Sequence, residues 1–172
     1  MKIKALFVLT VLLAVVLYGC ELPIFSEVPF ITFKGIRPTN KEVADTLVLT
    51  ITFRDGDGDL GISGQDSTAD FNYFIEAEKK LDGEFKPVVL PQFTPGVNNT
   101  FNGRFPILKP DGQPGPIEGD LDYTIGLIEP PDLTNELYIM PYDTLRFNIY
   151  IVDRANHQSN QITTSEIVVL KR

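Results

Sequence analysis

The chain has 172 residues and a formal net charge of −8, from 23 acidic and 15 basic side chains. This length is enough for one domain with a substantial core. The acidity argues against binding to nucleic acid or to anionic lipid head groups, and it favours cations as ligands. A single cysteine, Cys20, excludes an intramolecular disulfide, so core packing or a metal ion must stabilise the fold.

The N-terminus has the pattern of an export signal. Lys2 and Lys4 precede an apolar run over residues 5–17, which is too short to span a bilayer comfortably but has the length of a signal-peptide core. The run ends in Leu-Tyr-Gly-Cys, residues 17–20. This ending resembles the lipobox of bacterial lipoproteins, with Cys20 at the position that is lipidated in that family. An ordinary secretory signal or a buried helix is the alternative interpretation.

The lipobox resemblance implies cleavage before Cys20, a diacylglycerol thioether on its sulfur, and acylation of its amino group, as with palmitate. It places the protein in the bacterial cell envelope, anchored to a membrane through this lipid, with the outer membrane favoured. Residues 1–19 are then the signal peptide, residues 20–29, which contain two prolines and show no clear period, are a tether, and residues 30–172 form the domain. Loss of Lys2 and Lys4 would leave 13 basic and 23 acidic residues, a net charge of −10.

Beyond the tether the dominant hydrophobic period is two, which predicts β-strands. Residues 46–54, 71–79, 121–127 and 144–152 alternate in this way, and residues 166–170 form a short closing strand. Asp82-Gly83 lies between two strand-like runs and predicts a hairpin. No helical stripe is evident, and 13 prolines and 13 glycines punctuate the short strands. The predicted fold class is therefore an all-β antiparallel β-sandwich.

Two segments of the chain repeat one pattern. Residues 45–55 and 143–153 both begin Asp-Thr-Leu, continue with alternating apolar residues, and end in an aspartate. This pair is similar to the second and sixth strands of immunoglobulin-like domains of the cadherin and fibronectin type, which lie in opposite sheets. Residues 153–160 also resemble the turn after the penultimate strand of bacterial immunoglobulin-like domains, and the compositional style resembles Bacteroidetes-type envelope lipoproteins. A chance match between two buried strands of equal length is the alternative.

The immunoglobulin-like resemblance has a consequence for the loops that follow the two repeated segments. It implies that both loops lie at the same end of the sandwich. The acidic loop 55–66 would then face Asp153, Asn156 and Ser159, and its neighbours would carry oxygen atoms and no basic groups.

The loop after residues 46–54 places aspartates at alternate positions among glycines. Carboxylates this close repel one another, and Ca²⁺, which takes about six to eight oxygen ligands, would neutralise them. The predicted ligands are the carboxylates of Asp55, Asp57, Asp59, Asp66 and Asp153 and the carbonyl of Gly61. The loop is not an EF-hand, because a strand precedes it and Leu60 stands where that motif has glycine. The alternative is a solvated turn in which the aspartates cap backbone N–H groups.

The sequence offers little for catalysis. His157 is the only histidine, and there is no nucleophile elbow, zinc-type histidine pair or phosphate-binding glycine loop. We therefore expect a protein that is not an enzyme but a calcium-stabilised binding or structural module of the envelope, with a protein or glycan partner at the surface. The alternative is a glycan-binding lipoprotein, in which Phe93, Phe101 and Phe105 of the irregular stretch 86–120 act as sugar platforms.

Overall fold

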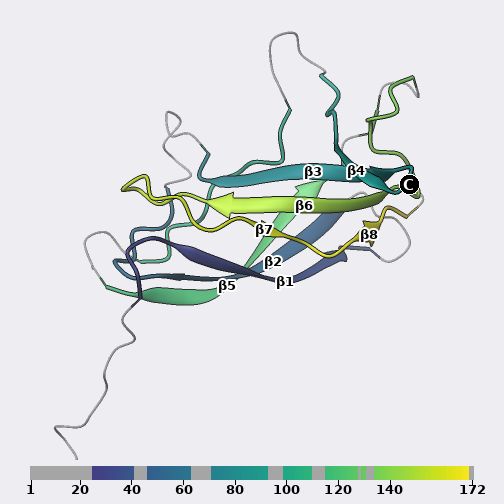
Figure 1. Cartoon of the computed structure of the whole chain (residues 1–172). Helices are drawn as coiled ribbons and strands as arrows, with labels where there is room; N and C mark the ends of the chain where they lie inside the picture. Colours follow the sequence, from purple (N-terminus) through teal and green to yellow (C-terminus); the bar gives the residue numbers. More distant parts are fainter. Residues whose placement is uncertain are drawn as a thin grey trace, which may run out of the picture.

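The computed structural model describes residues 25–40, 46–62, 71–92, 99–109, 115–127, 129–130 and 134–170. Cys20, Asp66 and Phe93 lie outside these ranges. The described part of the chain forms eight β-strands (Figure 1): β1 (Phe30–Pro38), β2 (Thr46–Asp55), β3 (Tyr73–Leu81), β4 (Glu84–Pro87), β5 (Ile117–Gly126), β6 (Thr144–Ile151), β7 (Ile162–Thr163) and β8 (Ile167–Val168). It contains no helix that is long and apolar enough to cross a membrane.

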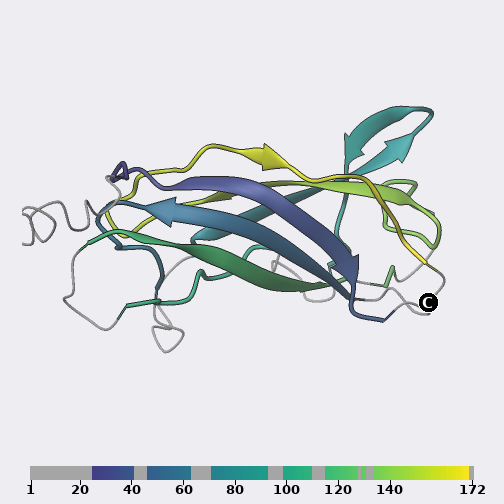
Figure 2. The same ribbon diagram turned by 90° about the horizontal axis from the view of Figure 1, so that it is seen from below.

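The strands form two antiparallel sheets that pack face to face (Figures 1 and 2). One sheet has the order β1-β2-β5, and the other has the order β4-β3-β6-β7, with β8 also paired to β6. The two repeated segments become β2 and β6, the central strands of opposite sheets, as the immunoglobulin-like resemblance implies. The predicted all-β, immunoglobulin-like antiparallel sandwich is confirmed.

The core lies between the sheets and follows from the alternation of the strands. Leu47, Leu49, Ile51 and Phe53 of β2 point inward and are at most 3% exposed. The same parity in β6 buries Leu145, Phe147, Ile149 and Ile151 completely. Because alternate residues of a strand point to the same face, the next inward positions are Asp55 and Asp153. The repeated pattern therefore directs two aspartates into the end of the core.

Every strand predicted from the hydrophobic alternation is present, with shifted ends. The Asp82-Gly83 turn has φ values of 52° and 88°, as a two-residue hairpin turn requires, and it joins β3 to β4. The closing strand is shorter than predicted, because Val169 instead bonds to the turn before β6, through Tyr142 N–H and Asp143 C=O. No strand was predicted over β1, whose sequence includes Lys34, Gly35 and Arg37 and buries only Ile31 fully.

Candidate metal centre

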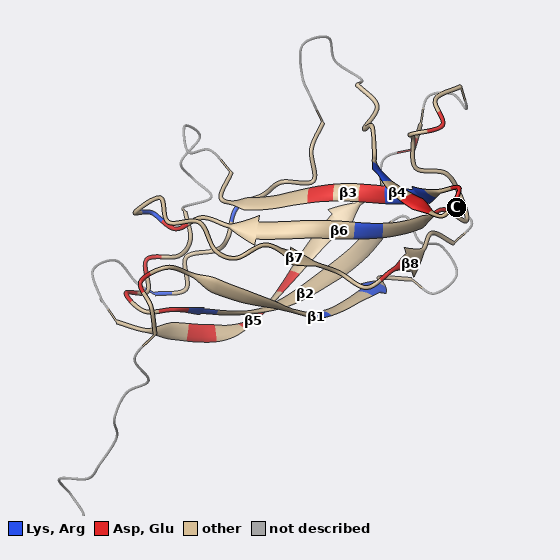
Figure 3. Cartoon of the chain, viewed as in Figure 1, with Lys and Arg blue, Asp and Glu red and all other residues tan. Residues whose placement is uncertain are grey.

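The loops that follow β2 and β6 meet at one end of the sandwich, as predicted. The backbone N–H of Ala155, in the loop after β6, donates a hydrogen bond of 3.0 Å to Oδ2 of Asp59, in the loop after β2. Figure 3 shows the acidic segments of both loops at this end. We call this region the acidic end and define it by Asp55, Asp57, Asp59 and Asp153.

Asp55 is the residue on which the acidic end is built. Its side chain is completely buried because it continues the inward face of β2. Its Oδ2 accepts a hydrogen bond of 3.3 Å from the N–H of Leu60, whereas its Oδ1 is buried without a hydrogen-bond partner among the described residues. An ionised carboxylate in this position is costly unless a further group compensates its charge.

Asp57 and Asp59 bring further carboxylates to Asp55. One oxygen of each of the three side chains lies within 4.8 Å of the others. Asp57 Oδ1 accepts a long bond of 3.4 Å from the N–H of Asp59, and Oδ1 of Asp59 is buried without a partner among the described residues. Oxygen ligands bound to one Ca²⁺ at about 2.3–2.6 Å lie no more than about 5 Å apart. The spacing of the three carboxylates fits one such ion.

The electrostatics of the cluster follow from burial and from like charge. Burial, and then the charges of Asp57 and Asp59, raise the pKa of Asp55 to about 6. Burial and the charges of Asp153 and Asp57 also raise the pKa of Asp59. Both shifts show that the fold disfavours the ionised carboxylates when no cation is bound.

Two glycines shape the loop through close contacts between backbones. Gly58 has φ +74°, and a Cβ atom there would lie 2.2 Å from the carbonyl oxygen of Gly115. Gly61 has φ +99°, and a Cβ atom there would lie 2.3 Å from the carbonyl oxygen of Pro106. Both positions therefore require glycine for the conformation and for the space. Gly61 thus has a structural role, and its carbonyl as a calcium ligand stays a prediction.

Asp153 lies beside the cluster but outside the group of three. Its carboxylate is engaged within its own turn, where Oδ1 accepts from the N–H of His157 at 2.7 Å and Oδ2 lies 3.0 Å from Nδ1 of His157. Its charge still contributes to the raised pKa values of Asp55 and Asp59. Asp153 therefore adds negative charge close to the three aspartates without being one of them, and its role as a calcium ligand stays a prediction. His157, the only histidine of the chain, holds Asp153 in place through these two contacts.

The remaining predicted neighbours differ from expectation. The hydroxyl of Ser159 accepts from Ile151 N–H and donates to the carbonyl of Asn160, so it serves the backbone of its own loop. Asn156 has φ 68° and makes the turn. The prediction that no basic group lies near the loop is wrong, because the charge of Arg154 lowers the pKa of Asp59, although less than burial raises it.

The N-terminal segment also reaches the acidic end. The carbonyl of Ser26 accepts from the N–H of Gly56 at 2.9 Å, and the guanidinium of Arg54 lies over the rings of Phe30 and Phe25, at 4.5 and 6.0 Å. The last residues of the segment predicted as a tether thus contact the sandwich beside the three aspartates.

The aromatic residues predicted as sugar platforms lie in other places than expected. Phe105 is completely buried and packs edge to face on Phe53, with ring centroids 5.0 Å apart. Phe101 is 6% exposed and packs on Phe147. The prediction of an open ring face is wrong for Phe105, because the irregular stretch contributes this ring to the core. Phe101 also packs in the core and is mostly buried, although it lines a pocket along β3. Phe93 lies outside the described residues.

Sequence reasoning missed three contributors to the acidic end. The N–H of Ala155 and the charge of Arg154 come from the turn after β6, and no sequence signal marks a backbone donor. The contact between His157 and Asp153 spans four residues of one turn, and the spacing alone does not distinguish it from a solvated loop.

Comparisons with known proteins return no relatives. No protein-family model matches the chain, and neither a curated protein nor a solved structure is significantly similar to it. The functional interpretation therefore rests on the residues and their geometry.

Proposed function

We propose that the protein is a non-catalytic, lipid-anchored module of the bacterial cell envelope, whose sandwich is stabilised by Ca²⁺ bound at the acidic end. One observation carries the calcium proposal: Asp55 is completely buried, its Oδ1 has no hydrogen-bond partner among the described residues, and one oxygen of its carboxylate lies within 4.8 Å of an oxygen of Asp57 and of Asp59. A solvated turn, the alternative interpretation, does not account for a buried unpartnered oxygen.

The role of the ion would be structural. The carboxylates of Asp55, Asp57 and Asp59 lie close enough together to share one ion, and Asp66, Asp153 and the carbonyl of Gly61 are the further predicted ligands. Extracellular modules bind Ca²⁺ with Kd on the order of 10⁻⁴–10⁻³ M. Bound Ca²⁺ at about ten to a hundred times Kd would stabilise the fold by about 1.4–2.7 kcal/mol.

Thermal melting tests the calcium proposal. We expect the protein to melt several degrees higher in millimolar Ca²⁺ than in metal-free buffer of the same ionic strength. Mg²⁺ should give a much smaller shift, because its small octahedral shell does not suit several carboxylates. Asp59→Asn should reduce the calcium shift, whereas Asp122→Asn, an exposed aspartate on β5 that pairs with Arg37, should retain it. Equal melting temperatures with and without Ca²⁺ would refute the proposal.

The lipid anchor is supported by the lipobox pattern at residues 17–20. Since Phe25 and Ser26 contact the end of β2 and the loop after it, a lipid on Cys20 would hold the acidic end toward the membrane. We expect bacteria that express the protein to incorporate labelled palmitate into it, and Cys20→Ser to abolish the incorporation. Labelling of the Cys20→Ser variant would contradict the anchor.

A further inference from the structure

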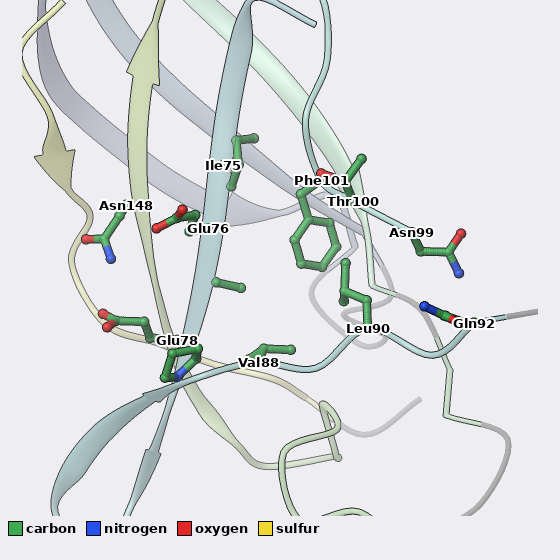
Figure 4. A pocket seen from close by; sticks show the side chains of 12 residues that line it. Ile75, Glu76, Glu78, Val88, Leu90, Gln92, Asn99, Thr100, Phe101 and Asn148 are labelled. Atoms are coloured by element: carbon green, nitrogen blue, oxygen red, sulfur yellow. The ribbon is translucent and has the colours of Figure 1, made fainter. Parts of the chain in front are cut away.

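A pocket of about 490 Å³ lies along β3, in the sheet with the strand order β4-β3-β6-β7 (Figure 4). A volume of this order suits a small ligand. The pocket is lined by β3 residues 75–78 and by the segments around residues 87–92 and 99–101, with Asn148 of β6. It lies in the sheet that does not contain β2, and its lining includes none of the aspartates of the acidic end.

The pocket coincides with a gap in the hydrogen bonding of the β3 edge. On one side of the gap, Gly103 exchanges backbone bonds with Tyr73, and Oδ1 of Asn102 accepts from Ile75 N–H at 2.8 Å. On the other side, the N–H of Val88 donates to the carbonyl of Ala77 at 2.9 Å. Between these bonds, the carbonyl of Ile75 and the N–H of Ala77 form no backbone hydrogen bond with a described residue. Ile75 and Ala77 both line the pocket, so the edge of β3 offers a backbone acceptor and a backbone donor, two residues apart, beside it.

The side chains divide the pocket into two halves. Figure 4 shows Ile75, Val88, Leu90 and Phe101 on one side of the β3 ribbon, which is the side of the core, and Glu76 on the other. Glu76 is exposed and makes no ion pair or side-chain hydrogen bond among the described residues, and no lysine, arginine or histidine lines the pocket there. The neighbouring Glu78, by contrast, is paired with Arg146 at 2.6 Å. The pocket therefore combines an apolar inner half with an uncompensated carboxylate on the outer half.

We propose that this pocket binds a short extended peptide segment, which completes the β3 edge through the carbonyl of Ile75 and the N–H of Ala77. In a parallel alignment, one residue of the added segment uses its own N–H and C=O to bond both groups. An antiparallel segment would need residues opposite Ile75 and Ala77, where Asn102 and Val88 already bond. The gap therefore selects a parallel segment centred opposite Glu76.

The register also sets the side chains that the segment should carry. The central residue, opposite Glu76, points to the outer half, where a positive charge would complement the Glu76 carboxylate. The residues before and after it point to the inner half, against Val88, Leu90 and Phe101. The preferred pattern is apolar–basic–apolar.

The test is a titration of the full chain, purified in mild detergent and labelled with ¹⁵N, with the peptide acetyl-Leu-Lys-Leu-amide. We expect saturable shifts of the amide signals of residues 75–77 and 101, with Kd of about 1 mM or tighter. The same peptide methylated on the lysine backbone nitrogen, which cannot donate to Ile75, should bind about tenfold more weakly. A peptide with glutamate in place of lysine should also bind about tenfold more weakly because of its like charge.

Two variants test whether the peptide lysine binds beside Glu76. Glu76→Gln should weaken binding of the lysine peptide by about fivefold and leave binding of acetyl-Leu-Ala-Leu-amide unchanged. Glu118→Gln removes another exposed strand carboxylate, in the other sheet, and should change neither. Equal binding of the methylated peptide, shifts confined to other residues, or no binding at about ten times the expected Kd would overturn the proposal. A neutral trisaccharide that shifts these amides when the peptides do not would assign the pocket to sugars and would also overturn it.

Discussion

The two ends of the sandwich differ in whether their inward-facing charged side chains form an ion pair with lysine or arginine. At one end, Lys79 of β3 is 2% exposed, and its ammonium lies 2.7 Å from Oδ2 of Asp143, just before β6. The same ammonium donates to the carbonyl of Tyr138, and the same carboxylate oxygen accepts from Met140 N–H. At the acidic end, no lysine or arginine of the described chain forms an ion pair with Asp55, Asp57 or Asp59.

The difference shows what a buried carboxylate needs at the end of a sandwich core. Where the chain provides its own cation, the carboxylate is neutralised and its oxygen is used in hydrogen bonds. Where it does not, the pKa of Asp55 rises to about 6, and Oδ1 of Asp55 and Oδ1 of Asp59 have no hydrogen-bond partner in the part of the chain that the structure describes. An external cation is the compensation that the acidic end lacks.

The largest change in stability is expected from a substitution that breaks the ion pair between Lys79 and Asp143. Lys79→Met should lower stability by about 3 kcal/mol, because it leaves Asp143 partly buried without its cation. For a protein of this size the melting temperature should fall by about 6–12 °C. Differential scanning calorimetry measures the change, and the loss should be the same with and without Ca²⁺.

Lys80 provides the matched control for Lys79. It follows Lys79 on the same strand, but it is exposed and pairs with exposed Glu166, so Lys80→Met should cost less than about 1 kcal/mol. A Lys79→Met variant as stable as Lys80→Met would show that the internal ion pair does not distinguish the two ends.

The pH dependence in metal-free buffer should be the next largest effect. A carboxyl whose folded-state pKa is raised from 3.8 to about 6 stabilises the fold below pH 4 relative to pH 7, and this contribution is lost as pH rises through about 6. Asp55 alone would contribute roughly 3 kcal/mol across this window, and the raised pKa of Asp59 acts in the same direction. Melting temperatures should therefore fall from pH 5 to pH 7 in the absence of metal.

Saturating Ca²⁺ should reverse this slope, because the ion binds the ionised carboxylates and competes with protons. Melting curves at pH 5 and pH 7, in metal-stripped buffer and in millimolar Ca²⁺, provide the comparison. If the melting temperature changes with pH in the same way in both buffers, ion binding is not linked to the raised pKa values, and this result would count against the metal centre.

The smallest change in stability is expected from Asp55→Asn. In metal-free buffer at pH 7 this change should raise stability by about 1 kcal/mol, because it removes a buried charge and keeps an acceptor for Leu60 N–H. The same variant should lose the calcium response. Asp122→Asn serves as the control and should leave both the metal-free stability and the calcium response close to those of the wild type. A destabilised Asp55→Asn protein in metal-free buffer would mean that the charge of Asp55 is compensated in the native fold.

Much of the fold was predictable because it depends on local alternation. The inward residues of β2 and β6 follow from a period of two, and the hairpin follows from Asp82-Gly83. Strand β1 escaped prediction because an edge strand with one fully buried residue, Ile31, shows little alternation. Phe101 and Phe105 were misplaced because an irregular stretch has no period from which to tell an inward ring from an outward one.

The candidate site also has features that the sequence predicts and features that depend on tertiary packing. The sequence by itself determined the three alternating aspartates, the glycines between them and the repeated pattern that ends in Asp55 and Asp153, since these depend on spacing along one strand and one turn. Only the tertiary structure decided which oxygens are compensated. The contact of His157 with Asp153 lies within one turn, but the spacing of the two residues alone does not predict it. That Ala155 donates to Asp59 and that Oδ1 of Asp55 has no partner among the described residues depend on how two loops about a hundred residues apart pack together, and no local pattern encodes that contact.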